Sequence, residues 1–66
     1  MTYQELTKLN KTQAEELLNT LNDAWMKTKD AQKHLEELGL DCEVVENASS
    51  VIYDKMSLVN RYLGNA

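Results

Sequence analysis

The chain has 66 residues and a net charge of −4, with one cysteine, two glycines and no proline. This size allows one domain at most, so we expect residues 1–66 to form a single domain near the lower limit for independent folding. The acidic balance argues against nonspecific nucleic-acid binding, which needs a cationic surface. The scarcity of helix breakers predicts an all-α fold.

The sequence also indicates where the protein works. Its single cysteine, Cys42, excludes an internal disulfide and fits a reducing compartment. The segment 1–5 has neither the basic start nor the apolar run of a secretory signal peptide, and no segment is apolar enough to span a membrane. We therefore expect a cytoplasmic protein with no membrane partner.

Two threonine-to-glutamate patterns predict where the first helices begin. Thr2 is followed by Glu5 and Thr12 by Glu15, and this spacing is typical of capping boxes. We expect a short helix near 3–9 and a long helix near 13–38. Because residues 10–12 contain no true breaker, one continuous helix over 3–38 is an alternative.

Two glycines and one capping residue predict where the long helix ends and where the third helix begins and ends. Gly39 can end the long helix in a left-handed conformation, and Asp41 can cap a third helix near 42–63 that ends before Gly64. Serines at 49 and 50 could kink this helix. The short turn predicts that the two long helices form an antiparallel hairpin.

The seam of the long helix recurs in steps of three and four, which is a heptad pattern, and it is apolar except at Thr28. Its residues are Ala14, Leu17, Leu21, Ala24, Thr28, Ala31, Leu35 and Leu38. The third helix is apolar over a wider arc that divides into two stripes. One stripe contains Val44, Val51, Leu58 and Tyr62, and the other contains Val45, Ile52, Met56, Val59 and Leu63. Counting from the turn places Ala31 near Ala48, Thr28 near Ile52 and Ala24 near Met56.

This pairing leaves residues 1–12 overhanging the hairpin and one stripe of the third helix without a partner. A chain this small needs an additional source of stability, and a second copy would cover both apolar surfaces. We expect a homodimer that forms a four-helix bundle, with a monomeric three-helix bundle as the alternative. The expected dimer interface contains Tyr3, Leu6, Leu9, Val44, Val51, Leu58 and Tyr62.

The candidate protein-binding residues lie on the long helix. Trp25 borders the heptad pattern, and Met26 points away from it among polar residues. Exposed tryptophan and methionine are typical anchors of protein interfaces. The expected binding surface consists of Asn22, Trp25, Met26, Lys29 and Lys33.

Catalytic and metal sites are not indicated. Lys55 lies within an apolar arc, but no second catalytic group lies beside it in the pattern. His34 and Glu37 offer too few ligands for a metal, and Cys42 has no resolving cysteine. We expect no enzyme activity, no cofactor and no metal.

The segment Met1–Asn10 is similar to the start of the plasmid copy-number family Rop, whose members are dimers of helical hairpins that bind paired RNA loops. The resemblance implies a hairpin dimer. The RNA-contacting surface of that family needs basic and polar residues and an aromatic residue, and only Asn10 matches. The positions that correspond to the family's other RNA-contacting residues carry Tyr3, Ala14, Leu18 and Trp25 in this chain.

A small, acidic helical chain with spare apolar surface is typical of a regulator that presents a helix face to a larger protein. An inhibitor or adaptor of the kind that phages and mobile elements encode is the most concrete form of this expectation. The first alternative is an acidic mimic of nucleic acid that blocks a DNA- or RNA-binding protein. The second is an RNA-binding dimer like Rop.

Overall fold

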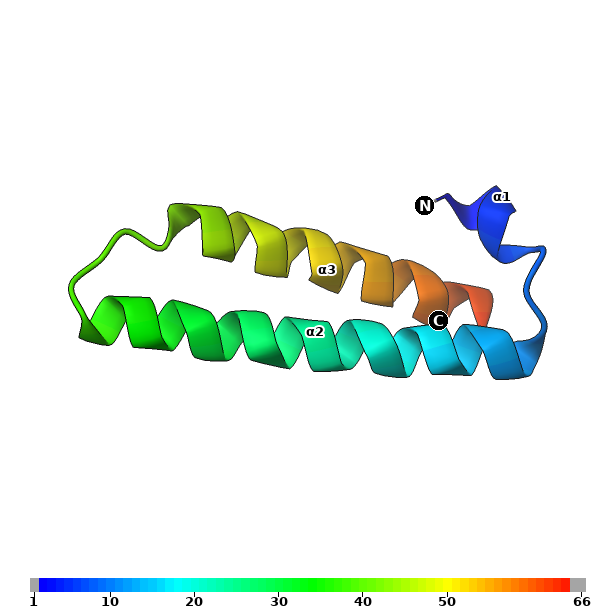
Figure 1. Cartoon of the computed structure of the whole chain (residues 1–66). Coiled ribbons are helices and arrows are strands. Elements are labelled where there is room, and N and C mark those ends of the chain that lie inside the picture. The colour runs from blue at the N-terminus through cyan, green and yellow to red at the C-terminus, as the bar shows by residue number, and fades with distance from the viewer. Residues whose placement is uncertain (1, 65–66) are drawn as a thin grey trace.

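The computed structural model describes residues 2–64, which form a helical hairpin with a short extra helix at its open end (Figure 1). Helix α1 spans Tyr3–Leu6, α2 spans Lys11–Glu37 and α3 spans Glu43–Tyr62. The two long helices pack against each other, and α1 lies against the end of α3. The expected all-α hairpin with a short N-terminal helix is confirmed, whereas its dimerisation remains a prediction. Residues 1, 65 and 66 of the expected domain lie outside the described range.

Helix α1 begins with the capping box that the sequence predicts. The backbone N–H of Thr2 donates to Glu5 Oε1 at 2.8 Å, and the backbone N–H of Glu5 donates to Thr2 Oγ1 at 3.3 Å. The helix ends at Leu6, earlier than expected. The next residues form a tight turn in which the N–H of Leu9 donates to the Leu6 carbonyl at 2.9 Å.

Helix α2 begins earlier than the predicted capping box of Thr12 and Glu15, so that prediction is wrong. Asn10, rather than Thr12, is the N-cap, and its side chain accepts from the N–H of Gln13 at 2.8 Å. Gln13 Oε1 accepts from the N–H of Asn10 at 3.0 Å in return. Asparagine caps helices better than threonine, and the earlier start lengthens the helix. This cap and the turn before it also exclude the continuous helix over 3–38.

The turn after α2 forms as the glycine predicts. Gly39 has a φ of 72°, and its N–H donates to the Glu36 carbonyl at 3.0 Å. The N–H of Leu40 donates to the Leu35 carbonyl at 2.9 Å, so these two bonds together form a Schellman motif. They satisfy carbonyls at the end of α2 and direct the chain back toward α3.

Helix α3 is continuous through the expected soft spot. Its N-cap is Cys42 rather than the expected Asp41, although Asp41 Oδ1 accepts from the N–H of Glu43 at 3.0 Å. The hydroxyl of Ser49 donates to the Glu46 carbonyl at 2.9 Å, so this serine bonds within the helix instead of capping a new one. Gly64, with a φ of 81°, follows its last turn.

The buried apolar core lies at the open end, where α1 meets the two long helices. Its buried members are Leu6, Ala14 and Val59. Partly buried side chains surround them: Leu9, Leu17, Leu18, Leu21, Leu58, Tyr62 and Leu63. Tyr62 also fixes the fold-back of α1, because its hydroxyl donates to the Leu9 carbonyl at 2.8 Å and its ring meets the Tyr3 ring edge-on at 5.7 Å.

Near the turn, the contact between α2 and α3 differs from the expected pairing. Ala31 and Ala48 were expected to meet, but both are exposed, and Gln32 and Ser49 lie on the contact side instead. An α-helix has 3.6 residues per turn, so positions seven apart drift by about 20° per heptad. After three heptads this drift turns Ala31 and Leu38 out of the contact and brings in Gln32.

No helix in the described range 2–64 combines the length and the apolar character needed to cross a membrane. The hairpin is long and narrow, with extents of 43 × 18 × 17 Å.

Candidate protein-binding surface

The hairpin has two long sides, and an aromatic pair marks one of them. Trp25 of α2 and Tyr53 of α3 have ring centroids 6.2 Å apart at 49°. Lys29 Nζ lies 5.7 Å from the centroid of the Trp25 ring, which is a cation–π geometry. Trp25 is partly buried and Tyr53 is exposed. We call the side that carries these residues the tryptophan side.

The structure brings the expected binding residues together on this side of α2. Asn22 Nδ2 donates to Met26 Sδ at 3.8 Å, and Met26 is 53% exposed. Lys33 is exposed and lies one turn beyond Lys29. The five residues therefore form one strip in which an indole and a thioether are bordered by an amide and two ammonium groups. The two lysines are the only charged residues in the strip.

Tyr53 belongs to the same surface, although the sequence reasoning did not assign it to a site. The predicted register placed Ala24 near Met56 and Thr28 near Ile52, which already puts Trp25 close to Tyr53. The signal was present in the helix pairing. It was missed because Tyr53 lies outside both apolar stripes of α3.

The residues expected at a dimer interface are divided between two roles. Leu6 is 1% exposed within the chain's own core, and Leu9, Leu58 and Tyr62 pack around it. Tyr3 contacts Tyr62 and stays partly exposed. The remaining two, Val44 and Val51, are 81% and 55% exposed. The fold-back of α1 thus uses most of the expected interface inside one chain.

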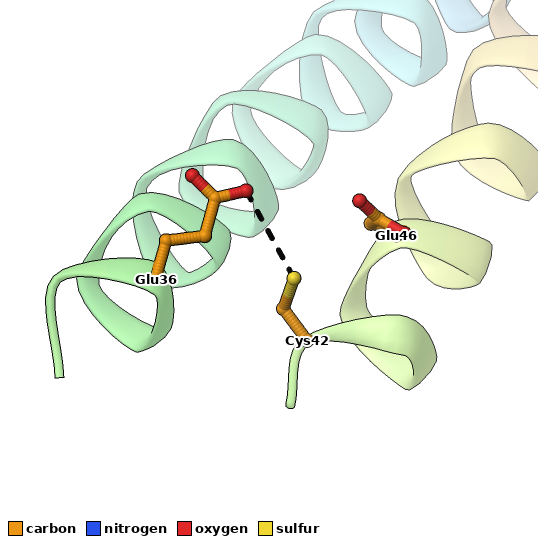
Figure 2. A group of neighbouring side chains, drawn as sticks. All are labelled: Glu36, Cys42 and Glu46. Atoms are coloured by element: carbon orange, nitrogen blue, oxygen red, sulfur yellow. Dashed lines mark hydrogen bonds between the residues drawn. The ribbon is translucent and has the colours of Figure 1, made fainter. Parts of the chain in front are cut away.

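A second group of neighbouring side chains lies where the hairpin turns. Figure 2 shows Glu36 of α2 beside Cys42 and Glu46, with the Cys42 thiol 3.9 Å from Glu36 Oε1. The Gln32 amide connects the two carboxylates, because its Nε2 donates to Glu46 at 3.2 Å and to Glu36 at 3.4 Å. Gln32 Oε1 is buried and has no hydrogen-bond partner.

The chemistry of this group is that of a protonated thiol among carboxylates. Burial raises the pKa of the Cys42 thiol, and the charges of Glu46, Glu36 and Asp41 raise it further. Cys42 is the N-cap of α3, and its side chain makes no cap hydrogen bond. One ligand atom from each of Glu36, Cys42 and Glu46 lies within 4.8 Å of the others, a spacing that could hold a metal ion. This set mixes a soft thiol with hard carboxylates, so it favours no particular metal.

Lys55, the residue considered for amine chemistry, lies partly buried on α3 facing the fold-back. The pKa of Glu5 is lowered mainly by its hydrogen bond from the Thr2 backbone, and the charge of Lys55 lowers it further. The charge of Lys55 is the smallest cause of this shift, so it contributes only a weak electrostatic interaction between α3 and α1. No local pattern pairs Glu5 with Lys55, because the two residues are 50 positions apart.

The part of the chain that the structure describes forms no pocket. No protein-family model, curated protein or solved structure matches this chain.

Proposed function

We propose that this chain is a small, non-enzymatic regulator, an inhibitor or adaptor, that binds a larger protein through the tryptophan side of its hairpin. The observation that carries the proposal is the strip formed by Asn22, Trp25, Met26, Lys29 and Lys33 on α2, joined by Tyr53 of α3. The single cysteine supports a cytoplasmic setting.

The residues of the strip indicate which kind of surface the partner protein presents. Trp25 and Tyr53 supply rigid aromatic area, and Met26 adds a flexible apolar contact. The ammonium groups of Lys29 and Lys33 border that area on a chain whose net charge is −4. The complementary surface is an apolar patch edged by carboxylates, such as one face of an acidic amphipathic helix.

A homodimer is part of the same proposal, and the size of the core supports it. Only three apolar residues are buried within the described range: Leu6, Ala14 and Val59. A chain this short with so small a core needs an additional source of stability, and one cysteine cannot supply an internal disulfide. A partner copy would bury the apolar residues that α1 leaves uncovered.

The nucleic-acid mimic is the second candidate, and one observation favours it. Five carboxylates lie between residues 36 and 46 with no lysine or arginine among them, which makes the turn end of the hairpin strongly acidic: Glu36, Glu37, Asp41, Glu43 and Glu46. A basic groove would contact this end, and the binding would weaken steeply as the salt concentration rises. Contact through the tryptophan side would depend less on salt.

One capture experiment separates the two candidates. The tagged chain and two variants are compared for retention of the same host protein, after circular dichroism has shown that each variant keeps its helicity. We expect Met26→Glu to weaken retention at least about tenfold, or about 1.4 kcal/mol, because it places a charge in a desolvated contact. A variant with both Glu36→Gln and Glu37→Gln should bind like the parent. Parental binding by Met26→Glu, with loss in the glutamine variant, would refute the regulator model and support the mimic.

A further inference from the structure

The side of the hairpin opposite Trp25 is apolar on α3 except for Lys55, and α1 covers only half of it. On α3, the residues of this side recur in steps of four and three: Val44, Ala48, Val51, Lys55, Leu58 and Tyr62. Figure 1 shows α1 at the open end of the hairpin, where Leu6 belongs to the buried core that Leu58 and Tyr62 pack against. Toward the turn, Val44 and Val51 remain exposed.

The long helix contributes to the same uncovered surface. With 100° per residue, the Trp25–Tyr53 contact on one side of the hairpin fixes which residues of α2 lie on the other side. Ala31 and Leu38 lie there, both exposed, and Leu38 is 60% exposed. We call the uncovered surface the valine face, and it consists of Ala31, Leu38, Val44, Ala48 and Val51.

We infer that the valine face binds the valine face of a second copy of this chain. The inference rests on the homodimer of the proposed function and specifies which residues form its interface. It also excludes Leu6, Leu9, Leu58 and Tyr62 from that interface, because α1 already covers them or contributes them to the core. The copies therefore meet only over the turn halves of their hairpins.

The exposed area supports a second copy as the occupant. The chain exposes 4885 Å², whereas a compact monomer of 7.6 kDa exposes about 4,300 Å². Its radius of gyration is 13.9 Å, against about 11 Å for a compact chain of this length. The excess of about 600 Å² approaches the roughly 800 Å² that each partner buries in a standard interface. Joining two hairpins would hide this excess in both copies.

The position of α1 determines how the copies are arranged. A second hairpin running parallel to the first would place its own α1 over the first α1, so the valine faces could not approach. A two-fold axis across the middle of the valine face makes the hairpins antiparallel and staggered, with each α1 beyond the turn of the other copy. In this arrangement valines of one copy can pack against alanines of the other.

Charge favours the same stagger. Each acidic turn, which carries Glu37 and Asp41, would reach the middle of the partner's α2. Lys27 lies there, one turn before Ala31 on the same flank of the helix. Opposite charges would meet at the edge of an apolar contact, which helps to set the register between the copies.

Sedimentation equilibrium with two matched variants tests the inference. Val51 and Met26 are 55% and 53% exposed, on opposite sides of the hairpin. The parent mass should rise from 7.6 kDa toward twice that value with concentration. Val51→Glu should raise the concentration of half-dimerisation at least about tenfold, whereas Met26→Glu should leave it unchanged. A parent that stays monomeric up to millimolar concentration, or an unchanged Val51→Glu variant, would overturn the inference.

A crosslinking experiment tests the two-fold axis. Ala48→Cys in a Cys42→Ser background places a thiol near the proposed axis, so mild oxidation should produce a covalent dimer in high yield. Met26→Cys in the same background is the control and should remain largely monomeric. Equal yields for the two variants would refute this interface. Target capture by the parent and by Met26→Glu is measured separately. A failed dimer therefore refutes the homodimer but leaves the proposed target binding standing, and failed target capture leaves the dimer standing.

Discussion

The two ends of the hairpin use the same pair of helices but hold them together by different chemistry. At the open end, Leu6 and Val59 are almost completely buried, and Tyr62 donates a hydrogen bond to the backbone of Leu9. At the turn end, the contact side carries the polar Gln32 and Ser49 beside Leu35 and Val45, which are only partly buried.

The difference shows what a third element contributes to a small helical protein. Two packed helices exclude water only along the line where they touch, so residues on both flanks stay partly wet. The four residues of α1 close one flank at the open end and complete a core there. Within residues 2–64 no corresponding element covers the turn half, where the hydrogen bonds of Gln32 to exposed carboxylates add little stability.

The largest expected effect comes from a leucine-to-alanine substitution, which we compare at the open end and at the turn end of the hairpin. Leu6→Ala removes a side chain that is 1% exposed and should cost about 2–5 kcal/mol, which is much of the stability of a domain this small. Leu38→Ala removes the same atoms from a side chain that is 60% exposed. At concentrations where the chain is monomeric, it should change the free energy of unfolding by less than about 0.5 kcal/mol.

Urea unfolding followed by circular dichroism measures both variants under identical conditions. Equal midpoints for Leu6→Ala and Leu38→Ala would mean that α1 does not contribute a core in solution. A large loss in Leu38→Ala at low concentration would instead show that the turn half has a packed core of its own.

The comparison also explains which parts of the fold the sequence could predict. The cap at Thr2 and the turn at Gly39 depend on residues a few positions apart, so local patterns were sufficient. The entry of Gln32 into the contact depends on a drift that accumulates over several heptads. The fold-back of α1 depends on Tyr62 and Leu9, which are 53 residues apart, and no local pattern encodes that pairing.

The candidate site divides in the same way. Asn22, Met26 and Lys29 share one face of α2 because of helical spacing, so the strip could be predicted from the sequence. The addition of Tyr53, and the meeting of Glu36 with Cys42, require the two helices to be joined at the correct register. His34 and Glu37 were the metal-ligand pair considered from the sequence. The turn instead brings Glu36, Cys42 and Glu46 together.

A medium effect is expected where the turn end contains a buried polar atom. Gln32 Oε1 is buried without a partner, which is unfavourable, and Nε2 bonds only to exposed carboxylates. Gln32→Leu should therefore raise the free energy of unfolding by about 0.5–1 kcal/mol, measured by urea denaturation. Gln32→Glu is the control, because a third carboxylate beside Glu36 and Glu46 should lower it. A destabilised Gln32→Leu variant would show that the amide bridge holds this end together.

The smallest effect concerns pH, and its sign differs between the two ends. At the open end the pKa of Glu5 lies below its ordinary value of 4.5, first because of the Thr2 backbone hydrogen bond. The stability that this group contributes is complete above pH 4.5 and is lost as the pH falls through the lowered pKa. At the turn end the raised pKa of Cys42 gives a contribution that is complete below the ordinary value of 9.0 and is lost as the pH rises through the folded value.

The turn-end half of this prediction can be measured directly, because the thiolate absorbs in the ultraviolet. The absorbance of the folded chain should titrate above pH 9.0, and Cys42→Ser should remove the step. A variant with Glu36→Gln and Glu46→Gln should lower the pKa of the thiol only part of the way toward its ordinary value. Burial is the largest cause of the shift, and these substitutions remove only the smaller, charge-dependent part. If the thiol of the parent titrates at or below pH 9.0, it is solvated. The side chains of Glu36, Cys42 and Glu46 would then lie farther apart than Figure 2 shows.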